Sequence, residues 1–235
     1  MLLEVKNIDA GYGFLQVLWD VSLSVDTGEY ISLIGPNGAG KSTTLKAISG
    51  LITPINGGVK FKDEKIDGLP ASRVCRKGIV YISEELNLFT QMTVRENLAM
   101  GAYTVKDKQK LTAGLDFVFE LFPRLAERKD QLAGTMSGGE RKMLALARGM
   151  MSSPSLMLVD EPSLGLSPRL TTVVFKCLEV LRNQGITILL VEQNVTKTLQ
   201  VTDRGYVLEK GKIVLEGKSS DLAQDDHVRK VFLGV

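Results

Sequence analysis

One short segment constrains the fold of this chain more than any other feature of its sequence. The segment reads GPNGAGKST, from Gly35 to Thr43, and it directly follows the apolar run YISLI at 30–34. It fits the pattern G-x-x-x-x-G-K-[ST], which binds phosphate where a strand leads into the loop and a helix leads out of it. The sequence therefore predicts a strand over residues 30–34, a helix over 41–49 and an α/β fold.

The residue types of this segment, called the phosphate loop from here on, suit nucleotide chemistry. Glycines let backbone N–H groups approach phosphate without an intervening Cβ, and the helix directs its positive end at the same atoms. We expect Lys41 to reach the β- and γ-phosphates and to act in catalysis, and Ser42 to ligate Mg²⁺. A chance match would occur in roughly one such chain in a hundred. The predicted nucleotide-binding residues are Gly35, Pro36, Asn37, Gly38, Ala39, Gly40, Lys41, Ser42 and Thr43.

Two acidic residues close another apolar run, LMLVDEP at 156–162. A buried strand that ends at Asp160 delivers a carboxylate to the edge of the sheet where open α/β folds bind ligands. We expect Asp160 to ligate Mg²⁺. Glu161 points in a different direction and is expected to orient and deprotonate the attacking water as the catalytic base. Taken alone, such a pair is more often a solvated strand end, but the phosphate loop in the same chain favours the catalytic interpretation.

A second glycine-rich helix start occurs in the segment MSGGE at 136–140. Ser137 and Glu140 have the spacing of a capping box, so a capped helix is the simplest interpretation. The paired Gly138 and Gly139 add something that capping does not need, because they leave the helix terminus open to an anion. The two helix starts either converge within one chain or serve different nucleotides. The second option implies a head-to-tail dimer with ATP between one subunit's phosphate loop and the other's Ser-Gly-Gly.

The remaining strands are expected from short β-rich runs, several of them almost wholly apolar as in a parallel sheet buried on both faces. Helical stretches follow the apolar runs and suggest βαβ units. The ending VLEKGKIVLEG turns at Lys210–Gly211 and predicts antiparallel edge strands. The predicted strands are residues 2–5, 21–25, 30–34, 79–82, 156–159, 186–191, 205–209 and 212–216.

A helical region interrupts this pattern between about residues 86 and 152. We expect a single domain over 1–235, in which 1–85 and 153–235 form the core with an antiparallel β part, and 86–152 form an inserted helical lobe. Within the lobe, the residues from 138 to 151 show one apolar helix face, made of Met143, Leu146, Ala147 and Met150.

Composition narrows the choice of partners. The 29 basic and 27 acidic residues give a net charge of +2, which argues against a nucleic-acid binder with a general basic field.

No run approaches the ~18 apolar residues of a bilayer span, and the N-terminus MLLEVKNIDAGYG lacks the features of a secretory signal. Cys75 and Cys177 form no disulfide framework or metal pattern, and we expect reduced thiols in a cytoplasmic protein. Any link to a membrane would then run through a partner.

The order of these motifs resembles the ABC ATPase family over nearly the whole chain. The phosphate loop, a helical lobe, MSGGE and then LMLVDEP follow one another as in that family, and the Ser-Gly-Gly segment is highly specific to it. The resemblance implies a RecA-like P-loop NTPase core with a mostly parallel sheet, an antiparallel β subdomain and an inserted helical lobe. It also implies hydrolysis of ATP with Mg²⁺ in a sandwich dimer, with Ser137, Gly138 and Gly139 binding the partner's nucleotide.

Further site residues follow from single matched positions. Tyr12, in GYG, resembles the aromatic residue that stacks on adenine. Glu84, in YISEELNLF, stands where most members have a glutamine that touches magnesium and reports to the transporter. Gln193, in LLVEQN, replaces the histidine that contacts the γ-phosphate, and Ser167 replaces the aspartate of the interface loop. Because glutamine carries no proton at neutral pH, we expect slower hydrolysis at this site. His227, the single histidine, is expected on the solvated surface.

The departures from the usual pattern resemble one ATP-binding subunit of branched-chain amino acid importers. The matching segments are VEQN, EPSLGLSP, the acid of SEE, and LFPRL with AGTMSGGE. The resemblance implies a second ATPase subunit in a homo- or heterodimer, permease subunits, and a position on the inner face of the cell membrane. The alternatives are a urea or amide importer, a lipid or lipopolysaccharide exporter, a soluble ABC protein acting on ribosomes or DNA, and a nucleotide sensor without turnover.

The segment from Glu84 to Thr93 is expected to pass motion to a permease. Its apolar residues Leu88, Phe89 and Met92 have two interpretations of equal weight. They either line a docking groove or pack within the helical lobe, and burial decides between these.

Overall fold

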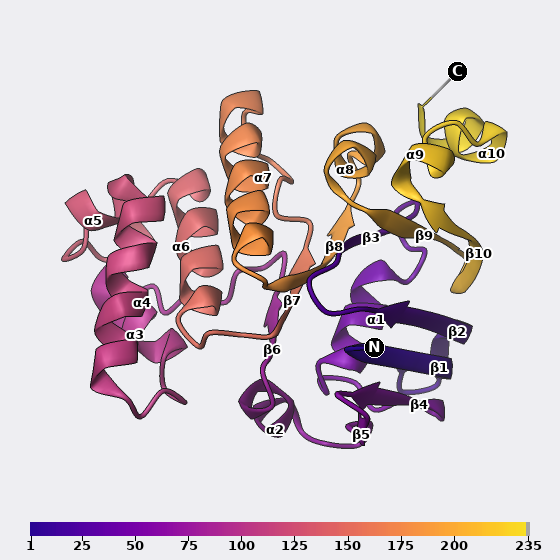
Figure 1. The fold of residues 1–235 in the computed structure, drawn as a ribbon, viewed down its shortest axis with the longest axis horizontal. Helices are drawn as coiled ribbons and strands as arrows, with labels where there is room; N and C mark the ends of the chain where they lie inside the picture. Colours follow the sequence, from indigo (N-terminus) through magenta and orange to yellow (C-terminus); the bar gives the residue numbers. More distant parts are fainter. Residues whose placement is uncertain (234–235) are drawn as a thin grey trace.

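The computed structural model describes residues 1–233 and has a six-stranded, mostly parallel sheet at its centre (Figure 1). The strand order is β10-β9-β3-β8-β7-β6, and only β10 runs antiparallel to its neighbour. The predicted hairpin joins β9 to β10, but only β10 is an edge strand because β9 also pairs with β3. The strands are β3 (Tyr30–Ile34), β6 (Ile79–Ile82), β7 (Leu156–Asp160), β8 (Thr187–Glu192), β9 (Arg204–Glu209) and β10 (Lys212–Lys218).

Apolar residues on both faces hold this sheet in the interior. In β7, Leu156 and Leu158 belong to a core shared with the N-terminal strands, whereas Met157 and Val159 belong to a core shared with the helices of the opposite face. This alternation follows from the two-residue period of a strand, which sends successive side chains to opposite faces. The apolar runs that predicted buried parallel strands are thus explained by burial on both sides.

A smaller antiparallel sheet, in the order β2-β1-β4-β5, covers one face of the core. Helix α1 (Lys41–Ile48) lies between the two sheets, where Leu45 and Ile48 are buried. β4 and β5 were not predicted from the sequence, because β4 begins with asparagine and two glycines, which are depleted in strands. The strands of this sheet are β1 (Leu3–Tyr12), β2 (Leu15–Val25), β4 (Asn56–Phe61) and β5 (Glu64–Lys65).

Helices cover the opposite face of the parallel sheet and fill the segment between β6 and β7. Helices α3 to α6 stand together at the left of Figure 1, away from the antiparallel sheet. The apolar face predicted for residues 138–151 lies on α6 and is buried. Within residues 1–233, no helix combines the length and the apolar character that a bilayer span requires. The other helices are α2 (Ala71–Arg76), α3 (Val94–Gly101), α4 (Lys108–Leu121), α5 (Pro123–Glu127), α6 (Gly138–Met150), α7 (Pro168–Asn183), α8 (Val195–Val201), α9 (Ser219–Leu222) and α10 (Asp226–Val228).

Both cysteines are free thiols, as the sequence predicted. Cys177 is buried on α7, and this burial raises the pKa of its thiol to about 11, so it stays protonated at neutral pH. The division of the chain into a core of 1–85 and 153–235 and a lobe of 86–152 stays a prediction.

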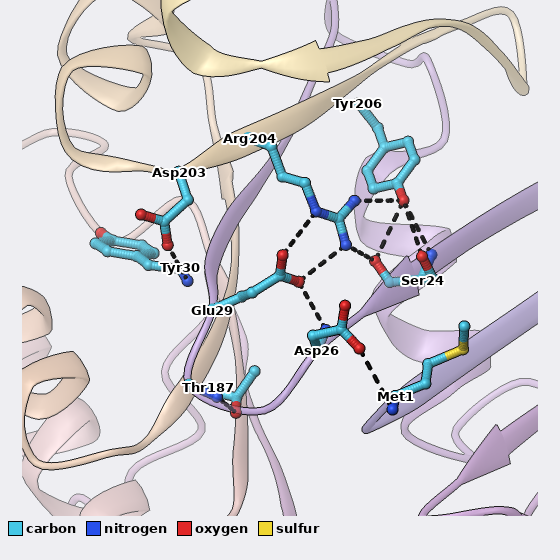
Figure 2. A network of polar contacts seen from close by, with 10 residues as sticks. Met1, Ser24, Asp26, Glu29, Tyr30, Thr187, Asp203, Arg204 and Tyr206 are labelled. Atoms are coloured by element: carbon cyan, nitrogen blue, oxygen red, sulfur yellow. Dashed lines mark hydrogen bonds and ion pairs between the residues drawn. The ribbon is translucent and has the colours of Figure 1, made fainter.

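A polar network ties the two sheets together at the ends of β2 and β9 (Figure 2). Arg204 donates to both carboxylate oxygens of Glu29, each at 2.9 Å. It also donates to the Ser24 carbonyl and to the Tyr206 hydroxyl, each at 2.6 Å. The same hydroxyl accepts the Ser24 N–H at 3.0 Å. Because Ser24 lies in β2 and Arg204 and Tyr206 lie in β9, the network fixes the antiparallel sheet against the parallel one.

The substitution Glu29→Gln is expected to weaken this network in a pH-dependent way. Burial alone would raise the pKa of Glu29, but hydrogen bonds from Arg204 and the Asp26 amide outweigh it and hold the pKa below its usual range. Such a carboxylate stabilises the fold above its unfolded-state pKa, and the contribution is lost as the pH falls through the folded-state pKa.

At pH 7 we expect Glu29→Gln to lower the free energy of unfolding by about 1 kcal/mol, as for a partly exposed charged hydrogen bond. The difference from the wild type should shrink below about pH 4. Urea denaturation from neutral to acidic pH measures it. A difference that does not change with pH would contradict the role of the Glu29 charge.

Candidate functional site

The carboxyl ends of four parallel strands meet at one edge of the central sheet. β3 leads into the phosphate loop, β6 leads toward Glu84, β7 ends at Asp160 and β8 leads into Gln193. Open parallel sheets bind their ligands at this edge, and a cleft of about 640 Å³ opens there. The cleft is lined by Tyr12, Leu15, Val17, Asn37, Gly38, Gly40, Lys41, Ser42, Thr43, Glu84, Glu161, Leu164 and Gln193.

Two glycines of the phosphate loop stand where a side chain has no room. A Cβ on Gly35 would lie 2.2 Å from the Leu208 carbonyl oxygen, and one on Gly40 would lie 2.6 Å from Leu18 Cδ2. Gly40 also has a φ of 109°, which strains any other residue. Gly38, by contrast, borders open space. The loop is therefore packed against β2 and β9 on one side and accessible on the other.

The phosphate loop also offers free backbone N–H donors. The first backbone hydrogen bond of α1 runs from the Thr44 N–H to the Gly40 carbonyl, at 2.9 Å. Free N–H groups before the first turn of a helix bind phosphate oxygens, so the loop fits the phosphates of a nucleotide. Among the described residues, no hydrogen-bond acceptor serves the backbone N–H groups of Gly38, Gly40, Lys41, Ser42 and Thr43.

Lys41 is buried inside the loop, with only 5% of its surface exposed. Its ammonium group donates to the carbonyls of Gly35 at 2.9 Å and of Pro36 at 3.1 Å. It also lies 3.6 Å from Glu161 Oε1. The cation is thus held at the point where the loop and the acidic end of β7 face each other.

The turn between β9 and β10 braces the phosphate loop from outside. The Gly211 N–H donates to the Ala39 carbonyl at 2.9 Å, and the Gly211 carbonyl accepts the Trp19 N–H at 2.8 Å. A Cβ on Gly211 would lie 2.0 Å from the Val17 carbonyl oxygen, so this close approach to β2 requires glycine. Gly211 therefore links the phosphate loop to β2, the strand that carries the cleft residue Val17.

Asp160 is oriented by two hydroxyl groups. Ser42 donates to its Oδ1 at 3.1 Å, and Tyr81 donates to its Oδ2 at 2.8 Å. Hydroxyl and carboxylate oxygens suit Mg²⁺, which proteins often hold with one or two carboxylates together with substrate phosphates. No cluster of three or more His, Cys, Asp or Glu side chains able to hold a metal occurs in residues 1–233. The Ser42 hydroxyl and the Asp160 carboxylate, 3.1 Å apart, are oxygen donors of the kind that fit a magnesium ion.

Glu161 follows β7 in an unusual backbone conformation. Its φ of 45° is rare for a residue with a side chain, and such strain concentrates at functional sites. The side chain is buried, and Gln193 Nε2 donates to its Oε2 at 2.5 Å. Burial raises the pKa of Glu161 above its ordinary value, against the opposing effects of Lys41 and Gln193. A carboxylate with a raised pKa is a suitable proton acceptor for water.

Tyr12 and Glu84 complete the cleft from different elements. Tyr12 is 47% exposed at the end of β1, with its hydroxyl 3.5 Å from Thr43 Oγ1. Lys46 Nζ lies 5.8 Å from the centre of its ring. An exposed ring beside a phosphate loop is suited to stacking on a base. Glu84 lines the cleft, and its charge contributes to the raised pKa of Glu161.

The second glycine-rich helix start lies outside the cleft. Ser137 caps α6 through the predicted capping box with Glu140, whose carboxylate accepts the Ser137 N–H at 3.0 Å. Ser137 and Gly138 are exposed, and a Cβ on Gly138 would meet only open space. Gly139 is buried, and a Cβ there would lie 2.4 Å from Leu170 Cδ1. No residue of this segment lines the cleft, so the two helix starts do not converge within one chain.

Two other predicted residues have structural roles. Ser167 caps α7 by accepting the Leu170 N–H at 3.4 Å. His227 is exposed, as expected, and its Nε2 lies 2.7 Å from Glu209 Oε1.

Three residues of the site were not predicted from the sequence. Tyr81 orients Asp160, and Glu192 accepts the Ser163 N–H at 2.8 Å. Lys142, on α6, donates to the Glu161 carbonyl at 3.1 Å. Glu192 offered a signal, since it is an acid at the end of an apolar strand. Lys142 offered none, because its contact depends on how α6 packs against the loop after β7.

Comparison with known proteins identifies the family. A family model described as ABC transporter matches residues 18–164. The chain belongs to the ABC transporter family. The ATP-binding protein BraG of Pseudomonas aeruginosa, for high-affinity branched-chain amino acid transport, is 46% identical over 99% of this chain and 100% of its own.

Two further relatives of this ABC ATPase differ in what they transport. The probable branched-chain amino acid transport ATP-binding protein LivF of Archaeoglobus fulgidus is 37% identical over 100% of this chain and 99% of its own. The lipopolysaccharide export ATP-binding protein LptB of Escherichia coli K12 is 33% identical over 99% and 97%, respectively.

Solved structures of ABC cassettes share the whole fold. The ADP conformation of one cassette has a TM-score of 0.85 at 28% identity and covers 100% of this chain and 99% of that chain. A nucleotide-free cassette has a TM-score of 0.84 at 28% identity, with the same coverage. The predicted fold class, a P-loop NTPase core with an antiparallel β part and an inserted helical lobe, is confirmed. The chain binds and hydrolyses ATP as the energising subunit of a transporter.

The substitution Gln193→His is expected to raise the rate of ATP hydrolysis. An imidazole at this position can carry a proton at neutral pH, which the amide cannot. We expect kcat to rise by roughly tenfold, a small part of what general acid–base catalysis contributes. Phosphate release at saturating MgATP measures it, with Gln193→Asn as a control that shortens the side chain but keeps the amide. Unchanged turnover in Gln193→His would count against the idea that the amide slows this site.

Proposed function

We propose that this chain closes head to tail with a second ATPase subunit on two ATP molecules and so drives a membrane importer. The observation that carries the proposal is the presence of two separate half-sites. The cleft holds Lys41 and Glu161, whereas the open helix start at Ser137 and Gly138 lies elsewhere on the surface. A second subunit placed head to tail would bring its own helix start over this phosphate loop. One solved cassette with this fold, 22% identical at a TM-score of 0.83, is a dimer bound to ADP and Pi.

In the proposed reaction, the described side chains position water and stabilise charge. Tyr12 stacks on adenine, and the amides of the phosphate loop bind the phosphates. Glu161 orients a water molecule for in-line attack on the γ-phosphate and accepts its proton, while Gln193 holds the Glu161 carboxylate. Lys41 stabilises the negative charge that develops on the transferred phosphoryl group. Positioning of this kind supplies most of the catalysis in phosphoryl transfer.

Magnesium is the proposed cofactor of this site. Ser42 and Asp160 would hold the ion, with Glu84 at the edge of the same cleft. When bound, magnesium neutralises charge on the β- and γ-phosphates.

A hollow between the core and the helical lobe is the proposed docking site for a cytoplasmic segment of a permease. It has a volume of about 360 Å³, and the apolar side chains of Phe89, Met100 and Tyr103 are exposed at it. Arg148 forms part of its wall and donates to the carbonyls of Leu86 at 2.8 Å and Asn87 at 2.7 Å. The loop that follows Glu84 is therefore held by α6, so a permease seated on this loop would be linked to the motion of the helical lobe.

The three apolar residues predicted for this groove divide between the two interpretations. Phe89 lines the hollow. Leu88 packs against the core of the helical lobe, and Met92 is half-buried and does not line the hollow. Of these three residues, only Phe89 supports docking.

Branched-chain amino acids are the proposed cargo class. Relatives named for branched-chain amino acid transport match this chain at 46% and 37% identity over nearly its full length. Lipopolysaccharide export is the second candidate, because LptB proteins match at about one-third identity over the same length. In either case the chain would lie in the cytoplasm, on the inner face of the cell membrane, attached through permease subunits.

A pull-down from membranes tests the proposal. Tagged Glu161→Gln is expressed in its native cell, and membranes solubilised in detergent with MgATP are passed over affinity resin. We expect two permeases and an ATPase subunit to co-elute, and Phe89→Asp in the same background should recover the ATPase without the permeases. Recovery of ribosomes or nucleic acid, or of nothing from the membranes, would overturn the transport proposal. Recovery of a lipopolysaccharide-exporting permease would replace the cargo class.

A further inference from the structure

Lys142 joins two parts of this chain that serve different nucleotides in the proposed dimer. It lies in the second turn of α6, close to the Ser-Gly-Gly start of the helix. Its ammonium group donates to the Glu161 carbonyl at 3.1 Å and also to the Leu164 carbonyl. These two carbonyls lie at the start and in the middle of the loop between β7 and α7. The contact therefore joins the helical lobe to Glu161, the catalytic residue of the core.

Apolar packing also holds the start of α6 against the region that follows β7. Gly139 lies so close to α7 that a Cβ there would be 2.4 Å from Leu170 Cδ1 and 3.7 Å from Leu166 Cδ2. Lys142 and Gly139 therefore both hold the start of α6 against the segment from Glu161 to Leu170. This segment cannot move far without moving the start of α6, because hydrogen bonds from Lys142 to its backbone and closely packed side chains join the two.

Three acidic residues, the buried Glu161 and Glu192 and the exposed Glu84, act on the ammonium group of Lys142 through their charges. Burial lowers the pKa of Lys142, and the carboxylates of Glu192, Glu84 and Glu161 oppose that effect. Glu192 is itself buried and accepts the N–H groups of Ser163 at 2.8 Å and Gln193 at 3.1 Å. The cation thus stands among the groups that hold the loop after β7 and the loop after β8.

We propose that Lys142 is a positioning residue that couples the two ATP sites of the dimer. The inference rests on the proposed head-to-tail arrangement, in which the start of α6 contacts the partner's ATP. When that helix start closes on the partner's nucleotide, Lys142 carries the displacement to the backbone of Glu161, which serves the nucleotide of its own chain. Closure at one ATP site thereby positions the catalytic base Glu161 at the other site, and ATP hydrolysis becomes cooperative.

The test compares Lys142→Met and Lys142→Arg with the wild type in the complex recovered from membranes through the tagged chain. Methionine keeps the length of the side chain and removes its donors, whereas arginine restores donors and charge. We expect Lys142→Met to lower kcat about 10-fold, within the usual range of coupling between sites, and to bring the Hill coefficient for ATP to 1. Lys142→Arg should recover part of both.

Two readouts separate coupling from a merely structural role. The Kd for ATP of the isolated chain and the urea midpoint of unfolding should be unchanged in Lys142→Met. Lys176→Met is the matched control, because Lys176 is exposed on α7 far along the helix from the cleft residues.

Three outcomes would overturn the inference, and they are distinguishable. If the wild type is cooperative and Lys142→Met equals it, the coupling role of Lys142 is wrong while the dimer stands. If Lys142→Met loses activity together with its ATP affinity or its fold, the residue is structural. If the wild type itself is a monomer with hyperbolic turnover, the proposed dimer fails, and the coupling fails with it.

Discussion

We expect Lys41→Ala to abolish tight ATP binding and ATP hydrolysis. The ammonium group is buried in the phosphate loop and lies 3.6 Å from Glu161 Oε1, where the γ-phosphate of a bound nucleotide would approach it. Hydrogen bonds to charged groups contribute about 1.5–3 kcal/mol, which corresponds to a rise in Kd of roughly 10- to 100-fold. Losing a donor aimed at developing charge costs a further factor of about 10²–10³ in kcat.

Titration with a fluorescent ATP analogue and a phosphate-release assay check both parts of this expectation. Lys176→Ala removes an exposed lysine of α7 and should match the wild type in both assays. A urea midpoint close to that of the wild type shows that the Lys41→Ala loop still folds. If folded Lys41→Ala bound ATP as tightly as the wild type, the phosphate loop would not be the nucleotide site.

Glu161→Gln is expected to bind MgATP and to stop before hydrolysis. Glutamine has the same shape but accepts no proton from water, and general-base catalysis typically contributes about 10²–10⁴-fold. Removing the carboxylate charge also relieves repulsion of the γ-phosphate in a site that already contains Glu84 and Asp160. The bound state should therefore persist, and closed dimers should accumulate.

Size-exclusion chromatography with MgATP, alongside phosphate release, measures both effects. Glu120→Gln is the matched control, because Glu120 is exposed on α4, outside the cleft. Hydrolysis at the normal rate in Glu161→Gln would show that another group is the base. Loss of ATP binding would show instead that the carboxylate holds the site together.

The parallel core could be predicted from the sequence because its chemistry is local and strong. Buried strands such as β7 and β8 are almost wholly apolar, and the phosphate loop between β3 and α1 follows a fixed spacing. The antiparallel sheet was harder to predict. β4 begins with Asn56, Gly57 and Gly58 and is a strand because it pairs with β1, a contact between segments far apart in the chain.

The site shows the same division between local and distant signals. Lys41, Ser42 and Asp160 could be named from motifs, and the structure brings them together at the carboxyl edge of the sheet. Tyr81 and Lys142 could not be named, since each acts through a contact that only the packing of β6 on β7 or of α6 on the next loop creates. The sequence also left open whether the two glycine-rich helix starts converge, because their separation depends on where the helical lobe sits.

The brace at Gly211 has a consequence for how fast nucleotide is exchanged. Because the turn after β9 already holds the Ala39 carbonyl and is anchored to Trp19, the loop loses little conformational entropy when it captures a triphosphate. We therefore expect association with an open chain to be governed by diffusion rather than by loop rearrangement. Differences in affinity among nucleotides should then appear mainly in the dissociation rate. With a bulkier residue at position 211, part of these differences should appear in the association rate instead.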